Sequence, residues 1–235
     1  MCDHCGCGQP EDHHHTHDTS GRTIELQQDV LAHDRQHAEA LRRRLAELDA
    51  RLVNVIGSPG CGKTALLVEL IGKLAGRRRS IVVEGDLATT NDAERIGATG
   101  APVYQVQTGT ACHLSAHDVE HGLEHLPLER GDLVLVENVG NLVCPSMFDV
   151  GETLRIVCLS VTEGTDKPQK YPVAFREAQL ALITKSDLLP HVDFDLEASL
   201  GMIRDIHPDA TTIVTSARDG SGLEELATQL LAMWP

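Results

Sequence analysis

The stretch 57–64 constrains the fold of this chain more than any other part of it. It reads Gly-Ser-Pro-Gly-Cys-Gly-Lys-Thr and matches the pattern G-x-x-x-x-G-K-[ST]. An apolar segment typical of a buried strand, 52–56, precedes it, and a helical pattern, 65–71, follows it. In this order, successive backbone N–H groups form an anion-binding nest at the N-terminus of a helix. The stretch therefore predicts a phosphate-binding loop at one edge of an α/β sheet, rather than an ordinary Gly-rich turn.

Each residue type in this loop has a chemical reason to be there. Glycines let the backbone curl around phosphate, Lys63 can reach the β- and γ-phosphate oxygens, and Thr64 can ligate Mg²⁺. Cys61 is interpreted as a small filler. The loop residues expected to contact a nucleotide are Gly57, Ser58, Pro59, Gly60, Cys61, Gly62, Lys63, Thr64 and Ala65.

A second motif, far downstream, predicts which base is bound. The strand pattern 180–184 is followed by Lys185-Ser186-Asp187. A carboxylate at Asp187 can accept hydrogen bonds from the ring N–H and the exocyclic amine of guanine, a donor pair that adenine lacks. Lys185 can lay its alkyl stem along the base, and the backbone of Ser216 and Ala217 is expected near the guanine oxygen. A polar turn would explain this motif alone, but together with the phosphate loop it predicts GTP and GDP as ligands.

The rest of the chain alternates strand and helix patterns. Helical patterns between most of the strands predict a mostly parallel sheet covered by helices on both faces. A hydrophobic fraction of 41% in 235 residues suffices for a sizeable core. Ligands of such sheets lie beyond the carboxyl ends of the strands, where all the motifs fall. The predicted strands are 52–56, 80–84, 103–107, 133–137, 154–161, 180–184 and 211–215.

Two further strand ends are expected to complete the nucleotide site. Asp86, after strand 80–84, is placed to meet Mg²⁺ directly or through water, and Glu137 ends strand 133–137. A backbone N–H at Gly140 is expected to bind the γ-phosphate. Because no glutamine follows Gly140 to position an attacking water, slow intrinsic hydrolysis is expected, which suits a switch. The predicted catalytic residues are Lys63, Thr64, Asp86 and Glu137, with Thr64 and Asp86 as the Mg²⁺ ligands.

Residues 1–24 are predicted to be a flexible metal-binding tail, followed by a GTPase domain over 25–235. Cys2, Cys5 and Cys7 form a Cys-x-x-Cys-x-Cys cluster that can enclose one soft or borderline cation, and the imidazoles of 13–17 add metal-binding capacity. The alternatives are a chance cluster or a redox pair for the cysteines and an expression tag for the histidines. Residues 29–51 are expected to form an amphipathic helix, on which His33 and His37 are interpreted as a solvated face.

A second candidate metal site lies within the predicted GTPase domain. Cys112 and His113 follow a strand and are expected to open a helix, where a thiol has a lowered pKa, and Cys144 lies four residues beyond Gly140. Their sulfur and nitrogen donors suit Zn²⁺ or Ni²⁺. One chain offers only these three ligands, so a symmetric dimer could share the site. The alternative is two structural cysteines and a surface histidine. His117, one helical turn beyond His113, is a candidate to support a metal ligand from behind or to bind transiently a metal ion that arrives from the tail.

Charge and hydropathy exclude several classes of partner. The formal net charge of −15 argues against nucleic acid, because such a surface repels phosphates. No stretch is long and apolar enough to span a bilayer, and the N-terminus lacks a hydrophobic signal segment. A cytoplasmic location is therefore expected.

Taken in order, these motifs carry a specific resemblance. The N-terminal cysteine cluster, the phosphate loop, Glu84-Gly85-Asp86, Cys112-His113 and the stretch 137–145 resemble HypB, the GTPase family for nickel incorporation into hydrogenase. The resemblance implies the fold of dimerising P-loop GTPases similar to the nitrogenase iron protein. It also implies a GTP-dependent homodimer, a small nickel-binding partner similar to HypA, and [NiFe]-hydrogenase precursors as clients. Its metal sites correspond to the tail cysteines for nickel and to Cys112, His113 and Cys144 for nickel or zinc.

Some positions depart from the family pattern. Cys61 stands where serine is commoner, and Ser115 stands where an aspartate is expected, which would remove an outer carboxylate from the metal site. Two other functions remain as alternatives. A urease accessory GTPase would share the phosphate loop and a Cys/His site without requiring the tail cysteines. A non-enzymatic nickel or zinc store would not require Lys63, Thr64 and Asp187.

Overall fold

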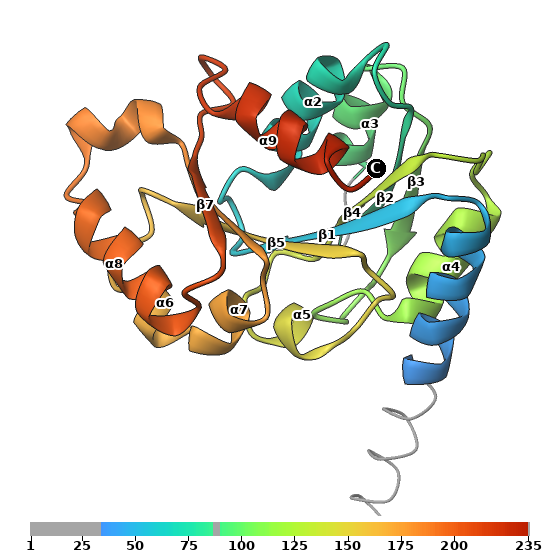
Figure 1. Ribbon diagram of the computed structural model, residues 1–235, viewed down its shortest axis with the longest axis horizontal. Coiled ribbons are helices and arrows are strands. Elements are labelled where there is room, and N and C mark those ends of the chain that lie inside the picture. The colour runs from blue at the N-terminus through green and yellow to red at the C-terminus, as the bar shows by residue number, and fades with distance from the viewer. Residues whose placement is uncertain (1–33, 87–89, 235) are drawn as a thin grey trace, which may run out of the picture. The chain divides into compact units, whose positions relative to one another are not determined.

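A seven-stranded parallel sheet forms the centre of the protein (Figure 1). The computed structural model describes residues 34–86 and 90–234. The strand order is β3-β2-β4-β1-β5-β6-β7, and every pair of neighbours is parallel. The predicted α/β fold and all the predicted strands are confirmed, with ends that differ by a few residues at most. The strands are β1 Arg51–Gly57, β2 Ser80–Asp86, β3 Val103–Gln107, β4 Leu133–Glu137, β5 Leu154–Ser160, β6 Leu180–Thr184 and β7 Thr211–Val214.

The inner strands are apolar on both faces because helices cover both faces. In β4, Leu133 and Leu135 pack toward one face, while Val134 and Val136 pack toward the other. This alternation is the ordinary two-residue period of a strand. The same alternation continues beyond Val136, so Glu137 faces the first side of the sheet and Asn138 faces the second. The two polar residues at the carboxyl end of β4 therefore contact different helix layers.

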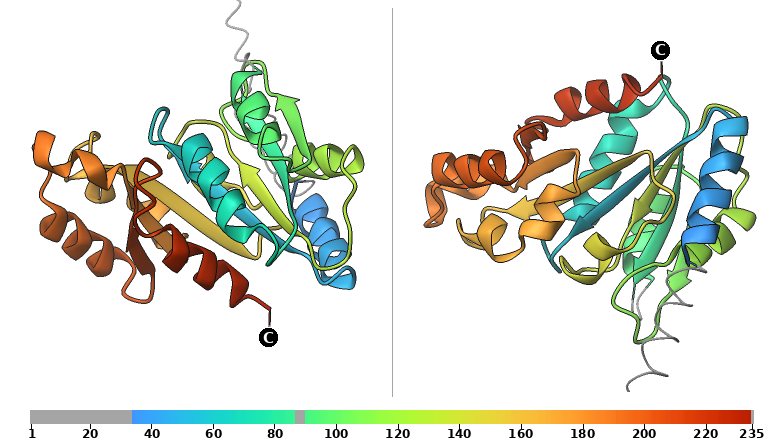
Figure 2. Two further views of the ribbon diagram at one scale, coloured as in Figure 1. Left: turned by 90° about the horizontal axis from the view of Figure 1, so that it is seen from above. Right: turned by 60° about the horizontal axis from the view of Figure 1, so that its bottom comes forward.

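Three helices cover the first face, and α2 and α9 lie side by side on it (Figures 1 and 2). The helix α2 begins directly at the phosphate loop, with Gly62 at its N-cap in the left-handed conformation. Its leucines Leu66, Leu67, Leu70 and Leu74 are buried against the sheet. The helices of this face are α2 Lys63–Leu74, α3 Asn91–Gly97 and α9 Leu223–Leu231.

The second face is covered by the helix of residues 34–47 together with α4 to α8. The N-terminal helix ends before the predicted boundary at Arg51, because Asp49 has a positive φ of 49° and Arg51 already belongs to β1. Residues 29–33 of its predicted range lie outside the described residues. The elements of this layer are α4 Ala116–Glu124, α5 Cys144–Met147, α6 Lys167–Lys170, α7 Pro172–Arg176, the 3₁₀ helix η1 Ser186–His191 and α8 Leu196–Ile206.

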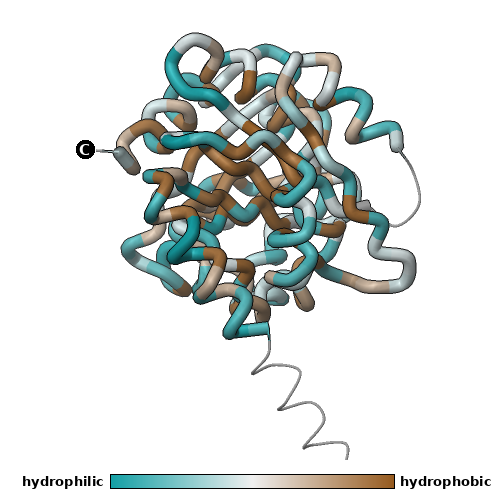
Figure 3. The backbone as a smooth tube through the Cα atoms, turned by 90° about the vertical axis from the view of Figure 1, so that its right-hand side faces the viewer, coloured by the Kyte–Doolittle hydropathy of each residue, from teal (hydrophilic) through white to brown (hydrophobic). Residues whose placement is uncertain are grey.

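The hydrophobic parts of the chain run through the middle of the fold, and hydrophilic parts gather on its outside (Figure 3). With few aromatic residues available, Leu, Val and Ile fill most of the core, together with several alanines. No helix in the described parts of the chain has the length and apolar character needed to cross a bilayer.

Candidate nucleotide and metal site

The phosphate loop joins β1 to α2 as the sequence predicts. Gly62 has a φ of 100°, a conformation that residues with a side chain rarely adopt. The Lys63 ammonium group lies inside the curl of the loop, where Nζ donates hydrogen bonds to the carbonyl oxygens of Gly57 at 3.3 Å and Ser58 at 3.4 Å. A cavity of about 390 Å³ opens over the loop. Its lining includes Pro59, Gly60, Gly62, Lys63, Thr64, Ala65, Glu137 and Gly140.

Cys61 contributes to this loop through its backbone. Its side chain is buried in the core with Cys158, and its carbonyl oxygen accepts a hydrogen bond of 2.6 Å from the Thr184 hydroxyl. The half-buried Ser58 hydroxyl instead accepts a hydrogen bond of 3.4 Å from Lys167 Nζ. The loop is therefore held by a hydrogen bond from β6 and contacted by Lys167 of α6, and no sequence pattern predicts the second contact.

Glu137 is a buried acid of the site with a raised pKa. Its Oε1 accepts a hydrogen bond of 2.8 Å from the Thr64 hydroxyl, and its Oε2 is buried with no hydrogen-bond partner among the described residues. Burial raises the pKa of this carboxyl to about 7, against the opposing charge of Lys63. A carboxylate beside a threonine hydroxyl, with one buried oxygen left over, fits the oxygen ligands that Mg²⁺ prefers.

The sheet brings a second acid to the same place. Glu84 in β2 pairs with Glu137 in the register of β2 and β4, and it lines the cavity. Asp86 is the last residue of β2, but its side chain lies outside the described part, so its role as a Mg²⁺ ligand stays a prediction. Asp92 and Arg95 of α3 also line the cavity. Glu84 could have been found from the sequence, since it belongs to the Glu-Gly-Asp stretch, whereas Arg95 needed the fold.

The segment after β4 passes directly over the phosphate loop. Asn141 forms an isolated antiparallel bridge with Gly57. A Cβ atom built on Gly140 would come within 2.9 Å of Pro59 Cα and 3.1 Å of Pro59 N, so only glycine fits there without a shift of the loop. Gly140 therefore lies where the sequence places it, beside the phosphate loop.

Asp187 and Ser216, predicted to contact the base, are hydrogen-bonded to each other. The Ser216 hydroxyl donates to Asp187 Oδ1 at 2.8 Å. The other carboxylate oxygen, Oδ2, forms an ion pair with Arg218 Nη1 at 3.8 Å. Lys185 has a left-handed φ of 58°, and its Nζ donates to the carbonyl oxygen of Gly60 at 2.6 Å. A second cavity, of about 520 Å³, is lined by Lys185, Asp187 and Ala217 and continues from the first across Gly62. It has the position needed for a base.

Cys112, His113 and Cys144 come together at the second face of the sheet. Their ligand atoms all lie within 4.8 Å of one another, and Cys112 Sγ is 3.7 Å from His113 Nδ1. The His113 ring stacks on Phe148 with centroids 3.8 Å apart. Burial lowers the pKa of His113, which favours the neutral imidazole that binds metals. Two thiols and one imidazole match the donors that Zn²⁺ and Ni²⁺ take.

Two sequence-based expectations about Cys112, its place at a helix start and its lowered pKa, are wrong. Cys112 and His113 lie in a loop rather than at a helix start, because α4 begins at Ala116 with Ser115 as its N-cap. The pKa of Cys112 is raised rather than lowered, chiefly by its contact with the Cys144 thiol. Two adjacent thiols resist forming two negative charges, and a bound cation would supply the missing positive charge. Ser115 thus has a structural role, in a reciprocal capping box with Asp118.

Asn138 connects the metal cluster to the strands. Its Oδ1 accepts hydrogen bonds from the backbone N–H groups of Leu114 and Val139, both at 3.0 Å. Its Nδ2 donates to Asn54 Oδ1 in β1 at 3.2 Å. The loop that carries Cys112 and His113 is therefore tied to the strand that leads into the phosphate loop.

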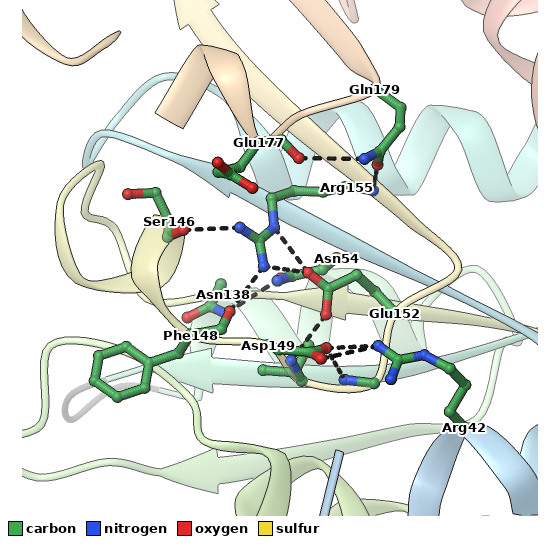
Figure 4. Close-up of polar contacts among 12 residues, drawn as sticks. Arg42, Asn54, Asn138, Ser146, Phe148, Asp149, Glu152, Arg155, Glu177 and Gln179 are labelled. Atoms are coloured by element: carbon green, nitrogen blue, oxygen red, sulfur yellow. Dashed lines mark hydrogen bonds and ion pairs between the residues drawn. The ribbon is translucent and has the colours of Figure 1, made fainter. Parts of the chain in front are cut away.

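Arg155 in β5 holds the turn that begins with Cys144 (Figure 4). Its guanidinium group is buried, bonds to Glu152, and donates to the carbonyl oxygens of Ser146 and Phe148, both at 2.8 Å. These two carbonyls belong to the turn that begins with Cys144 and ends with the ring stacked on His113. Asn138 belongs to the stretch 137–145 that carries the family resemblance, but its bonding role needed the fold, and Arg155 lies in no pattern that marks it as functional.

The predicted tail site falls outside the described residues. Cys2, Cys5, Cys7 and the histidines of 13–17 all lie there.

Comparison with known proteins agrees with this geometry. Residues 51–214 match the family described as CobW/HypB/UreG, nucleotide-binding domain. The hydrogenase maturation factor HypB of Azotobacter vinelandii is 47% identical over 207 residues, which cover 88% of this chain and 68% of that protein.

Two solved structures share the fold. HypB from Archaeoglobus fulgidus has a TM-score of 0.81 at 37% identity, covering 86% of this chain and 99% of that one. HypB from Helicobacter pylori in complex with nickel has a TM-score of 0.80 at 35% identity, covering 85% of this chain and 94% of that one. The chain therefore belongs to the HypB family of hydrogenase maturation factors, and its residues 51–214 form a CobW/HypB/UreG nucleotide-binding domain.

Proposed function

We propose that this protein is a GTP-hydrolysing metallochaperone that binds nickel and assists its insertion into [NiFe]-hydrogenase. One observation carries the proposal. A single short segment places Gly140 against Pro59 of the phosphate loop and, four residues later, Cys144 in the metal cluster. A nucleotide site and a thiolate metal site that share one segment can be coupled. A metal store or a GTPase without a metal function would not need such coupling.

The nucleotide half of the proposal assigns a role to each group in the cavity. Lys63 neutralises the β- and γ-phosphates, and Asp187 with Lys185, Ser216 and Ala217 selects guanine. Thr64 and Glu137, together with Asp86, would hold Mg²⁺, which would supply positive charge beside the transferred phosphoryl group. Asn141, rather than a glutamine, directly follows Gly140, so the conversion of GTP to GDP and phosphate is slow and acts as a switch.

The metal half assigns nickel or zinc as cargo. Cys112, His113 and Cys144 supply three donors from one chain, so a GTP-dependent homodimer would bring the clusters of two copies within reach of each other. Cys2, Cys5 and Cys7 form a further nickel site in the segment 1–24, ahead of the GTPase domain of 25–235. The relative solved with nickel supports nickel over other borderline cations.

The partners follow from the proposed role. A small nickel-binding accessory protein similar to HypA would exchange nickel with this one, and a [NiFe]-hydrogenase large-subunit precursor would receive it. The net charge of −15 speaks against nucleic acid as a partner. We further propose that the protein acts in the cytoplasm and has no membrane partner.

Deletion of the gene, followed by complementation, tests the proposal. Hydrogenase activity is expected to fail, to return with the parent gene, and to stay absent with Lys63→Ala. Lys73→Ala, an exposed lysine near the end of the same helix, is the matched control and is expected to complement fully. Failure of urease with intact hydrogenase would favour the urease alternative, and full activity with Lys63→Ala would favour a non-enzymatic metal store.

A further inference from the structure

A second cluster of metal-binding side chains lies between the helix of residues 34–47 and α4. The two helices run side by side in every view (Figures 1 and 2). Leu41 and Leu45 of the first pack with Val119 and Leu123 of the second in one hydrophobic cluster. This packing fixes which side chains meet at the margin of the contact. There, His37 of the N-terminal helix faces His117 and Glu120 of α4.

The three side chains are close enough to share one ion. His37 Nδ1 lies 2.7 Å from Glu120 Oε2, and the rings of His37 and His117 have centroids 5.0 Å apart. One ligand atom from each residue lies within 4.8 Å of the other two. The side chains of His37 and Glu120 are 25% and 27% exposed, so a solvated cation can reach them while they keep their packing. His37 is therefore not the solvated helix face that the sequence indicated.

The donors come from two rigid elements rather than from one mobile loop. His117 and Glu120 are spaced i, i+3 on α4 and so share a face of that helix. His37 approaches this face from a helix more than seventy residues earlier in the chain, in an arrangement that depends on the fold. A donor set of two imidazoles and one carboxylate is used for Zn²⁺ and other divalent transition metals, with positions left open for water.

The distances also fit binding without a rearrangement of the backbone. Zn–N and Zn–O bonds of ~2.0–2.2 Å in a tetrahedral site place two ligand atoms about 3.4 Å apart. The His37 and Glu120 atoms are nearer than that, at 2.7 Å. A small rotation of either side chain would open the pair enough to admit an ion in place of the shared proton.

We propose that His37, His117 and Glu120 form a divalent metal site for Ni²⁺ or Zn²⁺, separate from the cluster of Cys112, His113 and Cys144. The site contains no thiol, so it holds its ion more weakly than a cysteine site and exchanges it more readily. Because His37 and the other two ligands sit on different helices, the bound ion also ties the N-terminal helix to α4. The inference stands on these contacts and does not depend on the proposed delivery of nickel.

The test uses the full chain with Cys2, Cys5, Cys7, Cys112 and Cys144 replaced by serine and His113 by alanine, which removes the other proposed metal ligands apart from the histidines of 13–17. Paramagnetic Ni²⁺ is titrated while backbone amide signals are followed by NMR. Saturable broadening is expected around His37 and across 117–120. Competition with a chromogenic chelator then gives the affinity.

Glu120→Gln, which keeps the side-chain shape, is expected to weaken Ni²⁺ binding at this site by at least about tenfold. Glu124→Gln is the matched control, since it removes an exposed carboxylate one turn further along α4 and is expected to change nothing. As a second measurement, Glu120→Gln in the chain with native cysteines is expected to lower bound Ni²⁺ by one ion per chain. Equal affinities for the two variants, or broadening confined to residues 13–17, would overturn the proposal.

Discussion

Gly140 lies against Pro59 so closely that a Cβ atom on Gly140 would stand 2.9 Å from Pro59 Cα. The contact joins the segment that follows β4 to the loop that is proposed to hold phosphate. Cys144, at the end of the same segment, belongs to the metal cluster. A displacement of the phosphate loop must therefore move Gly140 and, through it, a metal ligand.

Gly140→Ala is expected to weaken GDP and GTP binding by roughly 5–150-fold, because overpacking against backbone atoms that cannot shift costs about 1–3 kcal/mol. The measurement is nucleotide affinity by fluorescence titration. Gly72→Ala is the control, since Gly72 is exposed on α2 with open space around it. That variant should bind nucleotide normally and be more stable by up to about 1 kcal/mol. Normal nucleotide affinity in Gly140→Ala would mean that the contact has no functional consequence.

Asp187→Asn is expected to lower the selectivity for GTP over ATP by roughly 5–150-fold, the equivalent of about 1–3 kcal/mol. The reason is the loss of an acceptor for two guanine donors, in a carboxylate already oriented by the Ser216 hydroxyl at 2.8 Å. Competition between GTP and ATP measures it, with the exposed Asp193→Asn as the control. If ATP competes no better against the variant than against the parent, Asp187 does not read the base.

Glu137 gives the protein a pH dependence with a definite sign. Burial raises its pKa from 4.5 to about 7, so folding takes up a proton between these values. Stability is therefore highest at the acid end of this window and falls as the pH rises toward 7. Mg²⁺ needs the ionised carboxylate, so Mg²⁺-dependent GDP affinity should rise over the same window. Glu137→Gln should remove both trends, which denaturant titrations and calorimetry at several pH values would detect. Unchanged pH profiles in that variant would assign the titration to another group.

Arg155→Met is expected to weaken Ni²⁺ and Zn²⁺ binding at the cysteine cluster, because the carbonyl oxygens of Ser146 and Phe148 lose the donor that holds their turn. Arg42→Met is a matched control, since Arg42 forms an exposed ion pair with Asp149 close by (Figure 4). Such surface pairs contribute about 0–1 kcal/mol. Chelator competition compares the metal affinities, and nucleotide affinity reports whether the fold survives. Equal metal affinities in a folded Arg155→Met would show that the turn holds its position without Arg155.

The parts of this molecule that could be predicted from sequence are those that a short stretch determines by itself. The phosphate loop, the buried strands and the Lys185–Asp187 stretch each carry a local pattern with a physical cause. The start of α4 could also be predicted from the sequence, because Ser115 and Asp118 have the spacing of a capping box. The expectation of a helix at Cys112 overlooked this signal.

The parts that could not be predicted depend on which strands become neighbours. Glu84 meets Glu137 only because β2 lies beside β4. Asn138 reaches Asn54 only because β4 lies beside β1. His37 meets Glu120 across more than eighty residues of sequence, in a contact set by helix packing. Such long-range contacts leave no periodic or motif-like trace in one sequence.

The central claim is that nucleotide and metal binding are coupled through the segment between Gly140 and Cys144. The most direct measurement is Ni²⁺ and Zn²⁺ affinity in the presence of GDP and of a non-hydrolysable GTP analogue, in the parent and in Cys144→Ala. A coupling of about 1–3 kcal/mol is expected, with the reciprocal effect of metal on GTP affinity equal in size. In Cys144→Ala the two nucleotide states should give the same metal affinity. Identical affinities in both nucleotide states of the parent protein would contradict the account and identify the cluster as a structural site indifferent to nucleotide.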